Sequence, residues 1–337
     1  MDETTTVRRT HRAHGARRTR RRGTTGALLA ALTTAALLAG CTVTGPDGDD
    51  ERGRDDGRRD DQVGTAPVGP VLAVKVDNAS AARPQTGLDA ADIVYAEQVE
   101  GGLSRLMAVY ATTFPETVGP VRSARESDLE LLRQFDEPTL AFSGAQSKLL
   151  PLIDRAPVHA KTPEDAQDAY FRGDEKPAPH NLYLRPNKLI DSPPGADALT
   201  TGFRYGPAPA GGTPEDSRTV RYPAARFTFT WSDDSRRWLL SMDGAETITT
   251  DDSRVAPATV VIQHVTIRES RFQDFLGNNT PYTQTVGSGR AEVLRDGRVF
   301  EANWERGTPT QGTTFTTPDG ERMNFAEGQV WVMYRAR

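Results

Sequence analysis

The sequence contains very little cysteine, histidine and lysine, and each shortage excludes a class of protein. With one cysteine in 337 residues, Cys41, neither a disulfide framework nor a cysteine-based zinc module can form. Five histidines are too few for a histidine-rich metal site in the folded part. The basic residues are 36 arginines and 5 lysines, and the net charge of −5 argues against a nucleic-acid partner.

The N-terminal 40 residues have the pattern of a secretory signal peptide. Eight arginines fall within residues 1–25, and an apolar run of 14 residues, 26–39, follows them. That run is shorter than the roughly 20 residues of a membrane-spanning helix, which favours a cleaved signal. An arginine pair at positions 20 and 21 leaves twin-arginine export open. The hydrophobic residues expected after that pair are missing, which favours the general secretory route.

Cys41 lies where a bacterial lipoprotein carries its lipid. The apolar run ends in Leu38-Ala39-Gly40-Cys41, the lipobox pattern, whose cysteine thiol is alkylated by diacylglycerol before the signal is cut off. Two or three acyl chains anchor a protein stably to a membrane. Residues 41–67 hold eight acidic residues and four arginines, which predicts a disordered acidic tether. We therefore expect an extracytoplasmic protein anchored to the cell membrane by lipid on Cys41.

A stretch rich in proline and glycine, residues 206–218, divides the remaining chain into two predicted domains, 68–205 and 219–337. Strand patterns and helical stripes alternate before this linker, whereas strand patterns follow one another after it. The sequence therefore predicts an α+β or α/β fold class, with an N-terminal mixed α/β domain followed by a β-rich C-terminal domain. Residues 68–337 carry a net charge of −7.

The spacing of apolar residues gives the expected elements. Before the linker it predicts strands at 71–76, 92–97, 103–112 and 139–143, and helices at 127–135, 146–154 and 163–170. After the linker it predicts strands at 226–231, 237–242, 260–268, 289–304 and 329–334, with a hairpin turn at 295–298. All four tryptophans lie in this second region, where core packing is favoured over a carbohydrate-stacking platform.

Polar residues gather at several places in the first region that are unlike ordinary core sequence. The first expected strand ends in Asp77-Asn78, and the loop after it presents Arg83. A second stretch holds Glu97, Glu100, a glycine pair and Arg105. Carboxylates and guanidinium groups placed so closely are candidates for binding a polar ligand.

The third stretch, Arg122-Ser123-Ala124-Arg125, gives the clearest prediction of a ligand site. It precedes the helix expected at 127–135, whose free N–H groups would favour an anion. Guanidinium forks suit phosphate and carboxylate groups, and with Arg83 and Arg105 these residues could form a cluster of four guanidiniums. The alternative is that the arginines form structural ion pairs with the nearby acidic residues, which are Asp77, Glu97, Glu100 and Glu126.

A fourth stretch contains two more candidate site residues, His180 and Asn181. His180 could be a catalytic base with Ser123 as nucleophile, although a lone histidine is more often a hydrogen-bonded structural residue. The carboxylates of the first two stretches could offer oxygen ligands to Mg²⁺ or Ca²⁺, but no metal-site signature is present and we predict no metal. Because no Walker loop or nucleophile elbow occurs, the sequence specifies neither a cofactor nor a mechanism.

Six motifs in this order resemble the YerB family of bacterial lipoproteins. They are VDN (76–78), ARPQTG (82–87), ADIVY (91–95), EGGLSR (100–105), VGPVRSAR (118–125) and APHNLY (178–183). Residues 287–289, Trp304 and the stretch 328–334 resemble that family's C-terminal domain. The resemblance covers nearly all of 70–337, and it implies an extracytoplasmic lipoprotein with an N-terminal α/β and a C-terminal β-rich domain, both of unknown function. The long arginine-rich leader and tether depart from the family's pattern.

Three functions are compatible with these features. We favour a membrane-anchored lipoprotein that binds an anionic envelope ligand or a protein partner through the arginine cluster, because the arginine motifs occur without a recognisable nucleophile. The alternatives are an enzyme acting on cell-wall or phosphoglycan substrates, and a structural assembly factor whose β-rich domain makes the contacts. The first alternative is similar to enzymes that transfer glycans from polyprenyl pyrophosphate, with Arg105, Arg122 and Arg125 holding the pyrophosphate. The acidic residues of those enzymes have no counterpart here.

Overall fold

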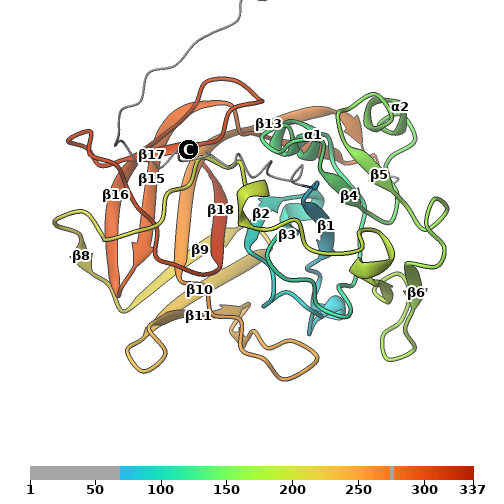
Figure 1. The fold of residues 1–337 in the computed structure, drawn as a ribbon, viewed down its shortest axis with the longest axis horizontal. Coiled ribbons are helices and arrows are strands. Elements are labelled where there is room, and N and C mark those ends of the chain that lie inside the picture. The colour runs from blue at the N-terminus through green and yellow to red at the C-terminus, as the bar shows by residue number, and fades with distance from the viewer. Residues whose placement is uncertain (1–68, 274–276) are drawn as a thin grey trace, which may run out of the picture. The chain divides into compact units, whose positions relative to one another are not determined.

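A computed structural model describes residues 69–273 and 277–337, in which strands dominate (Figure 1). In the first region the strands are β1 (Leu72–Asp77), β2 (Ile93–Gln98), β3 (Ser104–Tyr110), β4 (Thr139–Ala141), β5 (His159–Lys161), β6 (Tyr170–Arg172) and β7 (Leu182–Leu184). The second region adds β8 (Thr213–Pro214), β9 (Ser217–Tyr222), β10 (Ala225–Ser232), β11 (Arg237–Met242), β12 (Ala245–Glu246), β13 (Thr259–Gln273), β14 (Asn279–Gln284), β15 (Gly287–Arg295), β16 (Arg298–Arg306), β17 (Thr314–Thr316) and β18 (Val330–Ala336). The α-helices of these residues are α1 (Glu126–Leu132) and α2 (Leu150–Ile153). No helix in this part of the chain is long and apolar enough to cross a membrane.

One mixed sheet of twelve strands runs through both sequence regions. Its main path is β17-β16-β15-β13-β18-β2-β3-β1-β4-β5, with β14 paired to β13 and β8 paired to β16. The two regions meet at β18, which pairs in parallel with β13 on one side and with β2 on the other. Its apolar run Val330–Met333 is buried throughout, as expected of a strand in the middle of a sheet that is covered on both faces.

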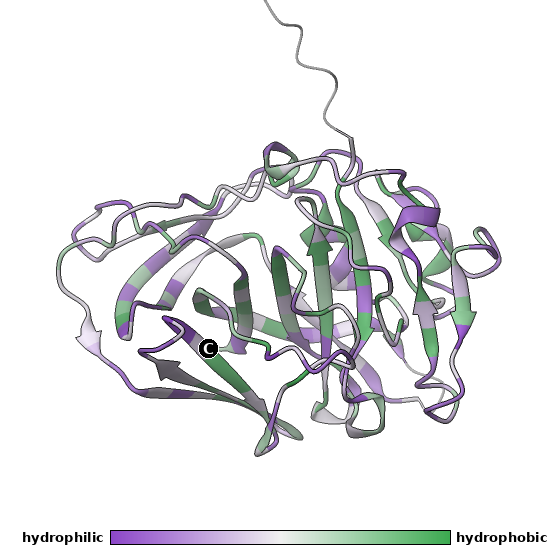
Figure 2. Ribbon diagram, turned by 60° about the horizontal axis from the view of Figure 1, so that its bottom comes forward, coloured by the Kyte–Doolittle hydropathy of each residue, from purple (hydrophilic) through white to green (hydrophobic). Residues whose placement is uncertain are grey.

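A second sheet of four strands, in the order β12-β11-β10-β9, packs on one face of the large sheet. Alternation along β10 buries Phe227 and Phe229, because successive side chains of a strand point to opposite faces. Their rings lie 6.4 and 6.1 Å from the ring of Trp331 in β18. Val74 of β1 joins the same core, so both sequence regions contribute to it. Figure 2 shows hydrophobic and hydrophilic bands along the same strands, as expected where successive side chains point to opposite faces.

The opposite face of the large sheet is covered by α1 and by loops. Leu131 and Leu132 of α1 belong to a second buried cluster that includes Tyr95 of β2. Arg306 of β16 ties this helix to the second region, since its Nη2 donates to the carbonyl oxygens of Glu130 and Leu131 at 2.9 and 3.3 Å. Carbonyls in the last turn of a helix lack partners within the helix, so the buried Arg306 acts as their cap.

The predicted α+β or α/β fold class is wrong, because the protein is mostly β and is built on one large mixed sheet. The helix expected at 146–154 is a single turn, α2, and the helix expected at 163–170 is a series of turns. The reason lies in the packing. The four-stranded sheet of the second region covers one face of the large sheet, where Ala169 and Tyr170 pack, whereas Leu149 and Ile153 pack on the other face beside α1.

Other expectations agree with the structure. The helix predicted at 127–135 is α1, and the strands predicted at 71–76, 92–97 and 103–112 correspond to β1, β2 and β3. The turn at 295–298 joins β15 to β16, with Asp296 and Gly297 at φ values of 51° and 68°, the left-handed conformation that an Asp-Gly hairpin adopts. Residues 206–218 contain β8 and the start of β9, and the division into two domains stays a prediction.

Trp331 provides a test of the packing between the two sheets. We expect Trp331→Ala to lower the free energy of unfolding by about 3–5 kcal/mol, because it leaves a cavity among side chains of both regions. Urea unfolding would measure this loss. The control is Arg335→Ala in the same strand, where the side chain is exposed and the change should stay within about 0.5 kcal/mol. A loss below about 1 kcal/mol for Trp331→Ala would contradict this description of the core.

Candidate functional site

The polar residues of the first region meet in one row across three strands. Arg105 of β3 is paired with Asp77 of β1 on one side and with Glu97 of β2 on the other. Residues that are directly opposite in paired strands point to the same face, so the three side chains lie together. This face is the one that α1 covers, and the row marks the place where its apolar packing gives way to charged groups.

Asp77 is the centre of the site. Its side chain is 2 % exposed, and its Oδ2 lies 2.8 Å from His180 Nδ1 and 3.0 Å from Arg122 Nε. Burial by itself would raise the pKa of Asp77, but the charge of Arg105 and the hydrogen bond from His180 outweigh it and hold that pKa below its usual value. Asp77 is therefore a buried carboxylate that orients a histidine and an arginine from two other segments of the chain.

Arg105 is nearly buried and has few partners. Its Nε lies 3.9 Å from Asp77 Oδ1, and neither Nε nor Nη1 has a hydrogen-bond partner among the described residues. Burial, together with the charge of Arg125, lowers the pKa of Arg105 to about 10. A buried guanidinium with unused donors is costly, and an anion placed beside it would remove that cost.

The side chain of Arg83 holds the loop after β1 in place through its hydrogen bonds and ion pair. Its Nε donates to Asn78 Oδ1 at 3.2 Å, and the same oxygen accepts Gln85 Nε2 at 2.8 Å. Its Nη1 forms an ion pair with Asp243, 2.7 Å away in the turn between β11 and β12. Arg83 therefore forms a structural ion pair, but its partner is Asp243 and not one of the four nearby acidic residues expected from the sequence.

The guanidinium group of Arg125 is likewise engaged by other groups of the protein. Its Nη2 lies 2.8 Å from Glu100 Oε2, and its Nη1 donates to the carbonyl oxygens of Ser123 and Ala124. Burial alone would raise the pKa of Glu100, but the hydrogen bond and charge of Arg125 lower it below its usual value. The anion site expected at the start of the helix is occupied by the protein itself, because Asp128 Oδ2 accepts the backbone N–H of Arg125 at 2.6 Å.

A buried lysine beside this row was not among the predicted site residues. Lys75 of β1 is fully buried, and its Nζ lies 2.6 Å from Glu97 Oε1 and 2.8 Å from Asp128 Oδ1. Burial raises the pKa of Asp128, to about 7, since the charge of Lys75 lowers it only in part and Glu97 repels a second negative charge. Burial would also raise the pKa of Glu97, but Lys75 lowers it overall. A lysine inside the apolar run of β1 was the signal in the sequence that could have identified this network.

One pocket, of about 490 Å³, opens beside Arg122 and Ser123. The rest of its lining comes from Ser143, from the turns before β6, from β6 itself, which includes Arg172, and from Pro179 and Leu182, and no acidic side chain contributes to it. Asn181 positions Arg172, whose Nη1 donates to the Asn181 Oδ1 at 2.7 Å. Arg172 was not predicted from the sequence, where it has no motif of its own. In an acidic protein, two guanidinium groups around a carboxylate-free pocket make a site for a negative charge.

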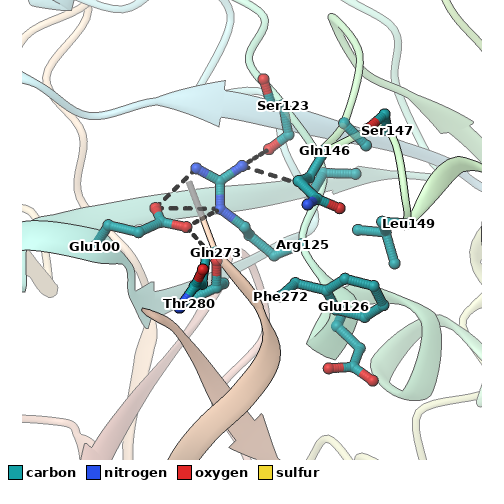
Figure 3. Close-up of a pocket in the computed structure, with 12 residues that line it drawn as sticks. Glu100, Ser123, Arg125, Glu126, Gln146, Ser147, Leu149, Phe272, Gln273 and Thr280 are labelled. Atoms are coloured by element: carbon teal, nitrogen blue, oxygen red, sulfur yellow. Dashed lines mark hydrogen bonds and ion pairs between the residues drawn. The ribbon is translucent and has the colours of Figure 1, made fainter. Parts of the chain in front are cut away.

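A second pocket, of about 410 Å³, adjoins the first at Ser123 (Figure 3). It is lined on one side by Glu100 and Arg125, and on the other by the loop that contains Gln146. Phe272 of β13 and Thr280 of β14 complete it, and Thr280 Oγ1 donates to Glu100 at 2.7 Å. The contribution of the second region could not be read from the sequence, because nothing there relates this hairpin to the motifs of the first region.

The structure assembles neither the catalytic pair of Ser123 and His180 nor the metal site considered from the sequence. Ser123 Oγ has Ser143 Oγ as its neighbour at 3.4 Å, while the histidine Nδ1 is turned to Asp77, so the described contacts do not join Ser123 to His180. The three carboxylates considered as ligands for Mg²⁺ or Ca²⁺ are each engaged by a lysine, arginine or histidine side chain. No group of His, Cys, Asp and Glu side chains in the described ranges is arranged to hold a metal. Cys41 lies outside these ranges.

Comparisons with known proteins agree with the resemblance seen in the motifs. Residues 57–198 match the family model "Protein of unknown function (DUF3048) N-terminal domain", and residues 218–332 match the corresponding C-terminal domain. Among curated proteins, the "Putative lipoprotein YerB" of Bacillus subtilis is 26% identical over 283 residues, which are 77% of this chain and 80% of that protein. The crystal structure of YerB from Bacillus subtilis has the same fold, with a TM-score of 0.64 at 23% identity, and the match covers 79% of this chain and 90% of that one. The resemblance to the YerB family is thereby confirmed.

Asp128 generates a prediction about pH. Its pKa in the folded protein, about 7, exceeds the ordinary value of 3.8, so its proton stabilises the fold at low pH. This stabilisation is complete below about pH 4 and is lost as the pH rises through 7. Asp128→Asn cannot titrate. Relative to the wild type, its free energy of unfolding should therefore improve by about 2–3 kcal/mol between pH 5 and pH 8.

Urea unfolding of both proteins at the two pH values measures this difference. Asp234→Asn, which changes an exposed carboxylate, is the matched control and should show no such trend. If the gap between Asp128→Asn and the wild type is the same at pH 5 and pH 8, Asp128 does not carry a raised pKa.

Proposed function

This chain belongs to the DUF3048 family, and we propose that it is a membrane-anchored extracytoplasmic lipoprotein. We propose further that it binds an anionic envelope ligand, or an acidic group of a protein partner. The binding site is the pocket beside Arg122 and Ser123, the Arg122 pocket. The anchor is a lipid on Cys41. Two observations support it, namely the signal-like leader that ends in Leu-Ala-Gly-Cys and the similarity to a Bacillus subtilis protein that is named a lipoprotein.

The distribution of charge around the Arg122 pocket is the observation that favours an anionic ligand. Arg122 Nε faces Asp77, yet the side chain is still 27 % exposed and lines the pocket together with Arg172. Behind it, Arg105 holds donors that no described residue uses. Arg105 and Arg122 therefore flank one inward-facing carboxylate, Asp77, and an anion in the pocket would meet Arg122 and Arg172.

Arg122→Ala tests the site. Hydrogen bonds to charged groups contribute about 1.5–3 kcal/mol, so the Kd for inorganic phosphate should rise about tenfold to a hundredfold. Isothermal titration calorimetry of the purified protein would measure both values. Arg236→Ala, which removes a highly exposed arginine from the second region, should bind phosphate as the wild type does. Equal phosphate affinity in Arg122→Ala and the wild type would exclude this pocket.

A second candidate function, an enzyme acting on phosphoglycans, is favoured by the contact between Asp77 and His180. The 2.8 Å distance from Asp77 Oδ2 to His180 Nδ1 fixes the imidazole ring and leaves its Nε2 for proton transfer. A carboxylate that orients a histidine in this way is the arrangement of a general base. Such a base would take a proton from an attacking hydroxyl or water while Arg122 holds the phosphate.

Hydrolysis of bis(p-nitrophenyl) phosphate tests this candidate. If His180 is the base, His180→Gln should lower kcat by about 10²-fold or more. His159→Gln, in the exposed edge strand β5, should leave kcat unchanged. Release of p-nitrophenolate at the same rate by all three proteins, or by none, would leave binding as the only supported function.

A further inference from the structure

The two pockets that adjoin at Ser123 differ in their chemistry. The segment between them is rigid, since Ser143 N donates to Arg122 O, and Ala124 N donates to Gly144 O, both at 3.0 Å. Arg122 N also donates to Lys75 O in β1 at 2.8 Å. Ser123 lines both pockets, so a ligand held in the first pocket lies next to the second.

Charges in the second pocket are neutralised by the protein. Glu100 and Arg125 form an ion pair 2.8 Å apart, so neither presents a free charge. Glu126 accepts the hydroxyl of Ser270 at 2.5 Å and lies 3.5 Å from Arg271 Nε. The first pocket thus offers positive charge, whereas the second offers none in excess.

The groups of the second pocket that can contact a ligand are uncharged polar groups and an aromatic ring. Gln146 uses its Oε1 to accept the N–H of Lys148, which leaves the amide Nε2 as a donor. Ser123 and Ser147 add hydroxyl groups. In Figure 3 the ring of Phe272, a residue that is 7 % exposed, lies below them beside Leu149 and Glu126. Pockets with an aromatic surface and a few placed donors and acceptors recognise neutral polar groups.

We propose that the second pocket binds a sugar unit adjacent to the anion, so that the ligand is a sugar phosphate or a phosphate-bearing glycan. The proposal rests on the anion site proposed above, and it adds the class of molecule that carries the anion. It also gives the second region a role in recognition, because Phe272 and Thr280 come from the hairpin of β13 and β14. A ligand seated there contacts both sequence regions at once.

Calorimetry with four probes tests the proposal on the purified protein: inorganic phosphate, glucose, glucose 1-phosphate and O-phosphoserine. We expect glucose 1-phosphate to bind at least tenfold more tightly than phosphate, and glucose alone to bind more weakly than either. O-Phosphoserine should bind no more tightly than phosphate. Equal affinity for phosphate and glucose 1-phosphate would overturn the sugar subsite while leaving the anion site in place, and tighter binding of O-phosphoserine would indicate a phosphopeptide instead.

Two variants assign the effect to the second pocket. In Gln146→Ala and in Phe272→Leu, which keeps an apolar side chain in the core, the tenfold preference for glucose 1-phosphate should fall toward one while the Kd for phosphate stays unchanged. Gln284→Ala, an exposed glutamine of β14, should keep the preference. A preference that survives both pocket variants would overturn the proposal. Absence of binding by every probe in the wild type would overturn the anion site and the sugar subsite together.

Discussion

A buried ammonium group holds the site in place. Lys75 brings Glu97 of β2 and Asp128 of α1 to β1, and Asp128 in turn receives the backbone N–H of Arg125. Because a buried charge without partners is very unfavourable, these groups have little freedom to separate. The segment 122–125 is fixed between this network and the loop at 143–144, so both pockets depend on it.

Strand positions and several polar contacts could be predicted because they are local or carried by short motifs. The apolar runs gave β1, β2 and β3, and the Asp-Gly pair gave the turn between β15 and β16. The motifs also placed Asp77, Arg105 and Arg122 in one site, and the structure brings these three together. What the motifs could not determine is which arginines are neutralised. Arg83 is paired with Asp243, a partner 160 positions away in the chain.

The fold class could not be predicted because it depends on which element covers the sheet. Apolar stripes at 146–154 and 163–170 indicate helices when each region is considered alone. In the folded protein the strands around Phe227 and Phe229 cover one face of the sheet, where the stripe at 163–170 packs as turns. The stripe at 146–154 packs on the other face and forms only a single helical turn. The same long-range packing brings Phe272 to the pocket beside Ser123. Neither contact leaves a periodic pattern in the sequence.

The place of β18 in the large sheet has a consequence for the order of folding. This strand follows all the other strands of the sheet in sequence, yet it lies between β2 and β13, which come much earlier. During folding, β2 and β13 cannot be joined in the large sheet until β18 is inserted between them, so the sheet remains incomplete until then. Pairing over such long separations is slow, and it leaves strand edges open to other chains in the meantime. The folding protein is therefore most vulnerable to aggregation just before its middle strand is inserted.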